Sequence, residues 1–277
     1  MKKIQFNDSE LLYPVGLGTW QMGEITSNKQ NELNTIFHAI DSGIQLIDTA
    51  EMYGEGKTEL LLKEVVKQKR NKIFLVSKFY PMNASKNKLK NALENSLSRL
   101  GTEWLDLYLL HWPSNISFDE IIESINVFKK SGKIRYFGVS NYSYDELKNI
   151  EDLIDNRSVV TNQVYYSLNN RGIEFDLLPY SQDKNCVTMA YSPFDQGGIF
   201  KNKNFLKLCE KHDFDPAALV IKFLLNKDLV LPIPKTSNLK NLKKMLNDLE
   251  KNLSNEYLES LSEIFPTPRK KLPLAII

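Results

Sequence analysis

Short runs of apolar residues alternate with longer amphipathic segments along almost the whole chain. The apolar runs predict buried strands, because they are brief, rich in branched or aromatic side chains, and bounded by glycine, proline or polar residues. In the segments between them, apolar residues recur every three or four positions, as on the buried face of a helix. The predicted strands cover residues 15–20, 46–48, 73–78, 105–112, 134–141, 159–164, 187–192 and 229–235.

Capping residues mark several of the expected helices. Ser143 and Glu146 have the spacing of a capping box, and Ser117 and Glu120 repeat it. Asp215 stands before a proline, the usual order of an N-cap and a first helical position. Together with the apolar stripes, these signals predict helices near 33–40, 57–69, 85–100, 117–132, 173–183, 215–224 and 238–249, with another after Ser143.

The alternation of strands and helices favours a parallel sheet with right-handed crossover connections. About eight such units in a chain of this length are what a (β/α)₈ (TIM) barrel requires. An open doubly wound sheet is the rival fold, but its nucleotide loop needs a third glycine that the segment after Gly16 and Gly18 lacks. We therefore expect one barrel domain over residues 1–277, with an N-terminal β-hairpin at about 4–13 and a C-terminal tail at about 265–277.

Composition narrows the function classes. The formal net charge of +2 gives no electrostatic case for binding nucleic acid or an anionic membrane surface. No apolar run approaches the ~18 residues that a membrane-spanning helix needs, and the N-terminal residues lack the apolar core of a signal peptide. Cys186 and Cys209 are the two cysteines, without metal-ligand spacing, which favours a reduced, cytoplasmic compartment and no metal site.

Three of the expected strands end on ionisable residues, Asp48, Lys78 and His111. Tyr53 lies on the loop that follows the first of these strands. Because active sites of such barrels are built at the carboxyl ends of the strands, we expect the four side chains to converge. Two of them also have a plainer interpretation, since Asp48 could cap a helix and His111 could be a hydrogen-bonded core residue.

These residue types together predict a catalytic site that polarises a carbonyl group. A free tyrosine has a pKa of about 10, so we expect the Lys78 ammonium to stabilise the Tyr53 phenolate and lower that pKa. The Asp48 carboxylate would keep the buried lysine charged, and His111 would orient the carbonyl oxygen by a hydrogen bond. No metal site and no nucleophilic serine is evident, so the attacking group is expected to be a hydride from a bound nicotinamide.

Two alternatives stay open at this point. Tyr144 and Lys148 have the spacing of the catalytic pair of short-chain dehydrogenases, although i,i+4 neighbours on a capped helix explain them as well. The chain could also be a nicotinamide-binding regulatory or sensor protein with little turnover.

Short motifs in a specific order make the sequence resemble the aldo-keto reductase family over nearly its whole length. They are GTW at 18–20, IDTAEMYG at 47–54, VSK at 76–78, LYLLHWP at 107–113, GKIRYFGVSN at 132–141, NQ at 162–163, YSP at 191–193 and IPKTS at 233–237. Within the family the chain looks most like the compact bacterial branch that includes methylglyoxal reductases. Its loops after His111 and Pro193, and its tail after Phe265, are short, which implies an open site for small carbonyl substrates.

The resemblance implies a role for each residue that matches a motif. The implied catalytic residues are Asp48, Tyr53, Lys78 and His111, with Tyr53 as the proton donor. The implied cofactor-binding residues are Gly18, Thr19, Trp20, Asp48, Ser140, Asn141, Gln163, Tyr191, Ser192, Pro193, Phe194, Lys235, Thr236, Ser237 and Asn241. The implied substrate-binding residues are Trp20, Tyr53, His111 and Trp112.

The resemblance also implies the cofactor and the reaction. Lys235 and Thr236 match the family's contacts to a 2′-phosphate, which favours NADPH. Asn241, Lys244 and Met245 depart from the family's usual residues near the adenosine, so use of NADH stays open. The expected activity is NADPH-dependent reduction of small aldehydes and ketoaldehydes such as methylglyoxal to alcohols, by a monomer.

Overall fold

The computed structural model describes the backbone of residues 1–277 and every side chain except that of Asn255. Its centre is a parallel sheet of eight strands in which each strand pairs with the next along the chain. The strands are β1 (Leu17–Gly18), β2 (Leu46–Asp48), β3 (Phe74–Phe79), β4 (Leu105–Leu110), β5 (Ile134–Ser140), β6 (Thr161–Tyr165), β7 (Val187–Tyr191) and β8 (Val230–Pro232).

Backbone hydrogen bonds also connect the segment of the first strand to that of the last strand. The N–H of Gly16 donates to the carbonyl oxygen of Pro232 at 3.0 Å, and the N–H of Gly18 donates to that of Pro234 at 2.9 Å. Glycine suits this close approach, because a Cβ on Gly18 would lie only 3.0 Å from the Ile233 carbonyl oxygen. The sheet therefore closes into a (β/α)₈ barrel, which confirms the predicted fold class.

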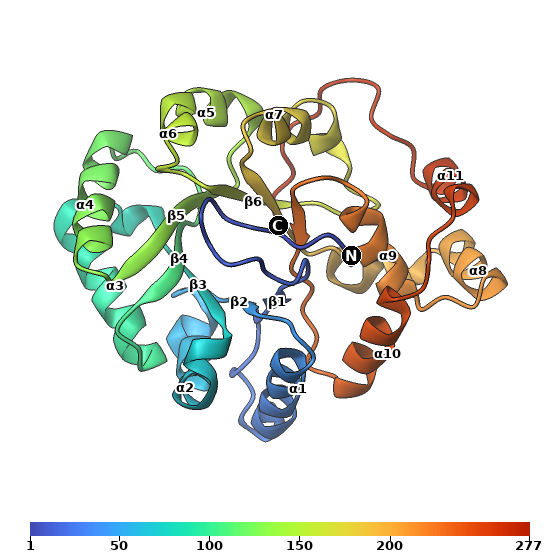
Figure 1. The fold of residues 1–277 in the computed structure, drawn as a ribbon, viewed down its shortest axis with the longest axis horizontal. Coiled ribbons are helices and arrows are strands. Elements are labelled where there is room, and N and C mark those ends of the chain that lie inside the picture. Colours follow the sequence, from blue (N-terminus) through green and yellow to red (C-terminus); the bar gives the residue numbers. More distant parts are fainter.

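The helices surround the strands on the outside of the barrel (Figure 1). They are α1 (Lys29–Asp41), α2 (Lys57–Lys69), α3 (Lys86–Leu100), α4 (Phe118–Lys130), α5 (Tyr144–Lys148), α6 (Glu151–Asp155), α7 (Leu177–Asp183), α8 (Lys203–Lys211), α9 (Pro216–Leu225), α10 (Leu239–Leu249) and α11 (Asn255–Ile264). Among the described residues, no helix has the length and apolar character needed to cross a membrane.

Capping follows the sequence signals closely. Ser143 and Glu146 form both halves of the expected capping box, and Asp215 accepts the first free N–H groups of α9. At α4 only one half forms: Ser117 accepts from the Glu120 N–H, while the Glu120 carboxylate accepts from the Lys86 N–H of α3 instead. The Glu120 carboxylate therefore binds a distant backbone N–H in place of the Ser117 N–H that a capping box would use.

One predicted helix is interrupted. The segment expected to be helical over 173–183 is a 3₁₀ turn (Gly172–Glu174) followed by α7. Pro179 is the third residue of α7, in the first turn, where a helix does not use the missing N–H. A helix that also included Phe175 would need that N–H as a donor to the Phe175 carbonyl, so α7 does not extend back to residue 173. Asp176 starts the new helix by accepting a hydrogen bond from the Leu177 N–H at 2.7 Å.

The N-terminal hairpin closes the end of the barrel where the strands begin. Ile4 and Leu12 form an antiparallel bridge, as expected for a hairpin near 4–13. Phe6 is fully buried and stacks on Phe74, the first residue of β3, with ring centroids 5.3 Å apart. In Figure 1 this segment, coloured dark blue, crosses the middle of the ring of strands. The opposite end, where the strands finish, carries the candidate site.

Candidate active site

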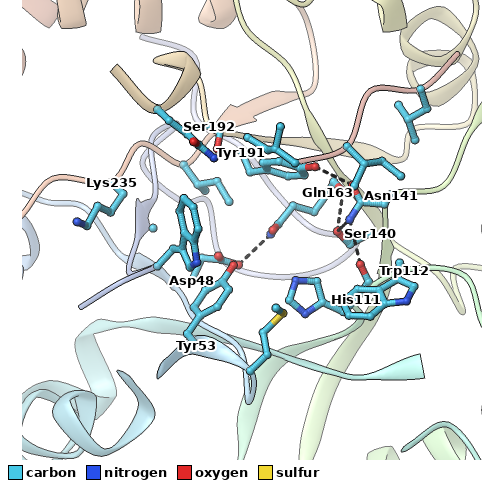
Figure 2. Close-up of a pocket in the computed structure, with 18 of the residues that line it drawn as sticks. Asp48, Tyr53, His111, Trp112, Ser140, Asn141, Gln163, Tyr191, Ser192 and Lys235 are labelled. Carbon is cyan, nitrogen blue, oxygen red and sulfur yellow. Dashed lines mark hydrogen bonds between the residues drawn. The ribbon is translucent and has the colours of Figure 1, made fainter. Parts of the chain in front are cut away.

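The ends of neighbouring strands bring the predicted catalytic side chains together. Asp48 is the last residue of β2, Lys78 is the last but one of β3, and His111 directly follows β4. Tyr53 begins a short 3₁₀ turn, η2 (Tyr53–Gly56), between β2 and α2. Figure 2 shows Asp48, Tyr53 and His111 around one cavity. The expected convergence is therefore present in the structure.

The Lys78 ammonium is held by three acceptors. Its Nζ donates to Asp48 Oδ2 at 2.8 Å, to the Thr49 carbonyl oxygen at 2.8 Å and to the Tyr53 hydroxyl at 3.1 Å. The residue is fully buried. Because an ammonium has three protons, these contacts use its whole donor capacity and leave it no freedom to turn away from the phenol.

Lys78 remains charged despite its burial. Burial alone lowers the pKa of a lysine, because a charge is poorly solvated inside a protein. The negative charge of Asp48 and the hydrogen bonds to Asp48 and Tyr53 outweigh that effect, so the net pKa of Lys78 is raised above its ordinary value. The cation expected beside the phenol is therefore in place at neutral pH.

The net pKa of Tyr53 differs from the expectation. Burial raises the pKa of the phenol, the Lys78 charge lowers it, and the Asp48 charge raises it again, with a net pKa above the ordinary value. The expectation that Lys78 brings this pKa below its ordinary value is therefore wrong, although Lys78 acts in the expected direction. The result keeps Tyr53 protonated at neutral pH, which is the state that a general acid needs.

His111 is neutral. Burial and the nearby Lys78 charge lower the pKa of His111 to about 2. Its ring lies edge-on to the Tyr53 ring, with centroids 6.0 Å apart and an interplanar angle of 74°. A hydrogen bond from Asn141 Nδ2 to the His111 carbonyl oxygen, 3.1 Å long, fixes the backbone. The imidazole can therefore orient a polar group beside the phenol without adding charge.

A hydrogen-bonded network from β5, β6 and β7 forms the other wall (Figure 2). Gln163 Nε2 donates to Asp48 Oδ1 at 2.8 Å, so Asp48 is held from both sides. The Ser140 hydroxyl donates to the Gln163 carbonyl oxygen at 2.8 Å. The Tyr191 hydroxyl donates to Asn141 Oδ1 at 2.9 Å, and its ring stacks on Tyr165 with centroids 5.9 Å apart. These polar groups line the same cavity as the catalytic residues.

The cavity has a volume of about 910 Å³ and is lined mostly by residues that the sequence singled out. This size lies within the usual range for sites that bind cofactors and small molecules. The predicted residues that line it are Gly18, Trp20, Asp48, Tyr53, His111, Trp112, Ser140, Asn141, Gln163, Tyr191, Ser192 and Lys235.

A second cavity of about 290 Å³ contains other predicted cofactor residues, namely Phe194, Thr236 and Asn241. Lys235 lines both cavities. Its ammonium makes no hydrogen bond or ion pair with any side chain that the structure describes. A single cation shared by two adjoining cavities suits an extended anionic molecule that reaches from one to the other.

Three predicted cofactor residues line neither cavity. Thr19 is fully buried, and its hydroxyl donates to the Asp48 carbonyl oxygen at 2.8 Å. Pro193 is buried between two lining residues. The Ser237 carbonyl oxygen accepts from the Thr35 hydroxyl at 3.2 Å. Their part in cofactor binding stays a prediction, and in the structure they support the backbone around the site.

Several lining residues were not predicted. They are Met52, Pro113, Glu146, Gln196, Ile233, Leu274, Ile276 and Ile277. Met52 and Pro113 adjoin catalytic motifs, and that adjacency was a usable signal. The C-terminal tail carried no such sequence signal, because its apolar residues do not recur with the spacing of a helix or a strand. It reaches the cavity because Arg171 donates to Thr267 Oγ1 at 2.8 Å and Lys271 donates to Asp145 at 2.7 Å.

The alternative catalytic pair lies elsewhere. Tyr144 lines a separate cavity of about 150 Å³, and its ring packs edge-on against Tyr180 with centroids 5.2 Å apart. Lys148 Nζ is 5.8 Å from the centroid of the Tyr144 ring, as expected for helical neighbours. Among the described residues, no cluster of three His, Cys, Asp or Glu side chains is arranged to hold a metal ion.

Known proteins are similar to this chain in sequence. Residues 14–265 match the family model for the aldo/keto reductase family. The methylglyoxal reductase YeaE of Escherichia coli (strain K12) is 38% identical over 281 residues, which covers 100% of this chain and 99% of that protein. The aldo-keto reductase YhdN of Bacillus subtilis (strain 168) is 32% identical over 197 residues, which covers 66% of this chain and 59% of that protein.

Solved structures match the whole barrel. The crystal structure of an aldo/keto reductase from Klebsiella pneumoniae in complex with NADP and acetate gives a TM-score of 0.95 at 35% identity, covering 100% of this chain and 99% of that one. A Klebsiella pneumoniae aldo-keto reductase in complex with NADPH gives the same values. A thermostable aldo-keto reductase in complex with the inhibitor epalrestat gives a TM-score of 0.86 at 31% identity, covering 95% and 99%.

Proposed function

The chain belongs to the aldo/keto reductase family of oxidoreductases, and we propose that it reduces small aldehydes and ketoaldehydes with NADPH, using Tyr53 as the general acid. The contact of Lys78 Nζ with both Asp48 Oδ2 and the Tyr53 hydroxyl carries this proposal. A phenol that touches a buried, charge-balanced ammonium is suited to release a proton to an oxygen on which negative charge develops.

The residues present fit a nicotinamide dinucleotide. When bound, this cofactor supplies a hydride to the carbonyl carbon of the substrate. Ser140, Asn141 and Gln163 present the hydroxyl and amide groups that a carboxamide needs as hydrogen-bond partners. Tyr191 offers a ring face beside them, and Lys235 offers a cation between the two cavities for a phosphate.

The contacts of Tyr53 identify it as the source of the proton that the substrate oxygen receives. The Tyr53 O–H gives its proton to the carbonyl oxygen as charge develops there, and the phenolate that remains lies beside the Lys78 ammonium. Asp48 keeps that ammonium charged throughout, and solvent afterwards returns the proton to Tyr53. His111, neutral and edge-on to the phenol, orients the carbonyl oxygen without competing for the negative charge.

Substrate selection follows from the apolar walls of the main cavity. Trp20, Met52 and Trp112 line it together with the tail residues Leu274 and Ile276. Such walls favour small carbonyl compounds with little charge. The Escherichia coli relative is named a methylglyoxal reductase, which supports methylglyoxal as the first compound to test. We further propose that the protein acts as a cytoplasmic monomer, without nucleic acid or membrane partners.

The experiment is direct. Purified protein is mixed with NADPH and, in turn, methylglyoxal and a nitrobenzaldehyde, and the absorbance of the reduced nicotinamide is followed. Oxidation of NADPH that depends on both the aldehyde and the protein is expected. Tight binding of NADPH without oxidation across a panel of aldehydes would instead identify a nicotinamide sensor. Absence of NADPH binding would overturn the proposal altogether.

Replacing Lys235 by Ala is expected to weaken NADPH binding about 10- to 100-fold and to leave NADH binding little changed. Hydrogen bonds to charged groups contribute about 1.5–3 kcal/mol each, and only NADPH carries the extra phosphate. Fluorescence titrations with the two cofactors measure the effect. Lys240→Ala is the control, because Lys240 is exposed on the nearby helix α10 and lines neither cavity. Equal losses for NADPH and NADH would place the phosphate contact elsewhere.

A further inference from the structure

Glu59 is a fully buried carboxylate for which the proposed reaction has no use. It lies in the first turn of α2, and its two oxygens have different partners. Glu59 Oε1 accepts from the Ser77 hydroxyl of β3 at 2.7 Å, and Glu59 Oε2 accepts from Arg99 Nε of α3 at 2.6 Å. One side chain of α2 therefore links β3 and α3.

Its partners adjoin the two residues that must meet for catalysis. Ser77 directly precedes Lys78 on β3. On the other side, Glu59 itself lies in the first turn of α2, the helix that follows the η2 turn carrying Tyr53. That turn also rests on Arg99, because a Cβ placed on Gly56 would lie 2.7 Å from Arg99 Cδ. The segment that carries the Tyr53 phenol and the strand that carries the Lys78 ammonium therefore both contact the Glu59–Arg99 ion pair.

These contacts of Glu59 affect the hydrogen bond between Tyr53 and Lys78. The two side chains come from different elements, and their hydrogen bond of 3.1 Å is already at the long end of the usual range. A small displacement of the η2 turn relative to β3 would break it. The Glu59 carboxylate is fully buried and the Arg99 side chain is partly buried. An ion pair of this kind adds little net stability compared with apolar packing, which leaves room for a geometric role.

We propose that Glu59, Ser77 and Arg99 are positioning residues that set the separation between the Tyr53 hydroxyl and the Lys78 ammonium. The inference rests on the proposed function, in which that separation governs proton donation. It concerns the chemical step alone, because none of the three residues lines either of the two candidate cofactor cavities.

The test measures kcat and KM separately. Ser77→Ala and Glu59→Gln are expected to lower kcat for aldehyde reduction about 10- to 100-fold, because misplacement of reacting groups by about 1 Å has effects of this size. The KM for the aldehyde and the Kd for NADPH should change little. Arg99→Lys keeps a cation for Glu59 and should retain more of kcat than Arg99→Met. If Glu59→Gln does not fold, Ser77→Ala carries the test, because it removes a single hydroxyl.

A matched control exists at the other end of the same elements. Asp106 is also a buried carboxylate, and it accepts from the Leu75 N–H of β3 at 2.9 Å. It pairs with Arg70, which follows α2, and with Arg135, each at 2.9 Å. Asp106→Asn therefore disturbs a comparable network near the start of β3. It should lower the midpoint of urea unfolding while leaving kcat unchanged.

The outcomes separate the inference from the proposed function. Loss of stability without loss of kcat in Ser77→Ala and Glu59→Gln, as in Asp106→Asn, would overturn the inference while wild-type turnover upholds the function. If the wild type reduces no carbonyl, the function fails, and crystal structures of wild type and Ser77→Ala decide the inference. A longer Tyr53–Lys78 separation in the variant supports it, and an unchanged separation overturns it.

Discussion

Tyr53→Phe is expected to lower kcat for aldehyde reduction by about 10²- to 10⁴-fold, the contribution that a positioned general acid makes. The change removes the hydroxyl and keeps the ring, which faces Lys78 Nζ at 4.8 Å and lies edge-on to His111. NADPH binding should therefore stay close to that of the wild type. Single-turnover and steady-state rates with methylglyoxal, together with a fluorescence titration of NADPH, measure both quantities.

The matched control for this variant is Tyr144→Phe. Tyr144 lies in the separate cavity between α5 and α7, so loss of its hydroxyl should leave the rate unchanged. If Tyr144→Phe abolished turnover and Tyr53→Phe did not, the catalytic assignment would be wrong and the alternative pair would take its place.

The pH dependence of the wild type tests the same assignment. Reduction needs the protonated phenol, so the rate should fall as the pH rises through the pKa of Tyr53. Because that pKa is raised above its ordinary value, the fall is expected only above about pH 10. His111, with its pKa lowered to about 2, should add no second limb near neutral pH. A rate of the chemical step that falls between neutral pH and pH 9 would contradict the raised pKa.

Lys78→Met is expected to abolish measurable turnover and to lower the free energy of unfolding by about 3–5 kcal/mol. Methionine is close to lysine in length, so the main change is the loss of charge. Asp48 then becomes a buried carboxylate without a cation, which is strongly destabilising, and the Tyr53 phenolate has no counter-charge. Urea unfolding and steady-state rates measure the two effects.

A double variant separates the structural part of this effect from the chemical part. Adding Asp48→Asn removes the unpaired carboxylate, so stability should partly return, because the two residues interact directly and their effects are not additive. Activity should not return, since no cation faces Tyr53. Recovery of both stability and activity in the double variant would show that Lys78 serves only to balance Asp48.

Local patterns were sufficient for the barrel and for much of the site. The alternation of apolar runs and amphipathic segments follows from burial on a strand or on one helix face, and it depends on near neighbours in the chain. Asp48 and Lys78 stood out because ionisable groups at the ends of buried strands need partners. The box at Ser143 and the cap at Asp215 formed as expected, because both ends of each contact lie within a few residues.

Local signals failed where a distant group competed with a near one. Glu120 bonds to the Lys86 N–H rather than completing its own capping box. In the segment 173–183 the helical stripe was real, but Pro179 has no N–H for the Phe175 carbonyl, so the helix begins only at Leu177. Resemblance to a family supplied the cofactor residues; Thr19 and Ser237 line neither cavity, and their part in cofactor binding stays a prediction.

Other properties of the site depend on how distant parts of the chain pack together. The net pKa of Tyr53 is one, because burial, Lys78 and Asp48 act in opposite directions and only the packed arrangement sets their balance. The docking of the tail against the cavity and the joining of Ser77 to Arg99 through Glu59 are others. A sequence pattern records the burial of each segment separately. It does not record which buried groups meet, since such contacts arise between segments only when the barrel closes.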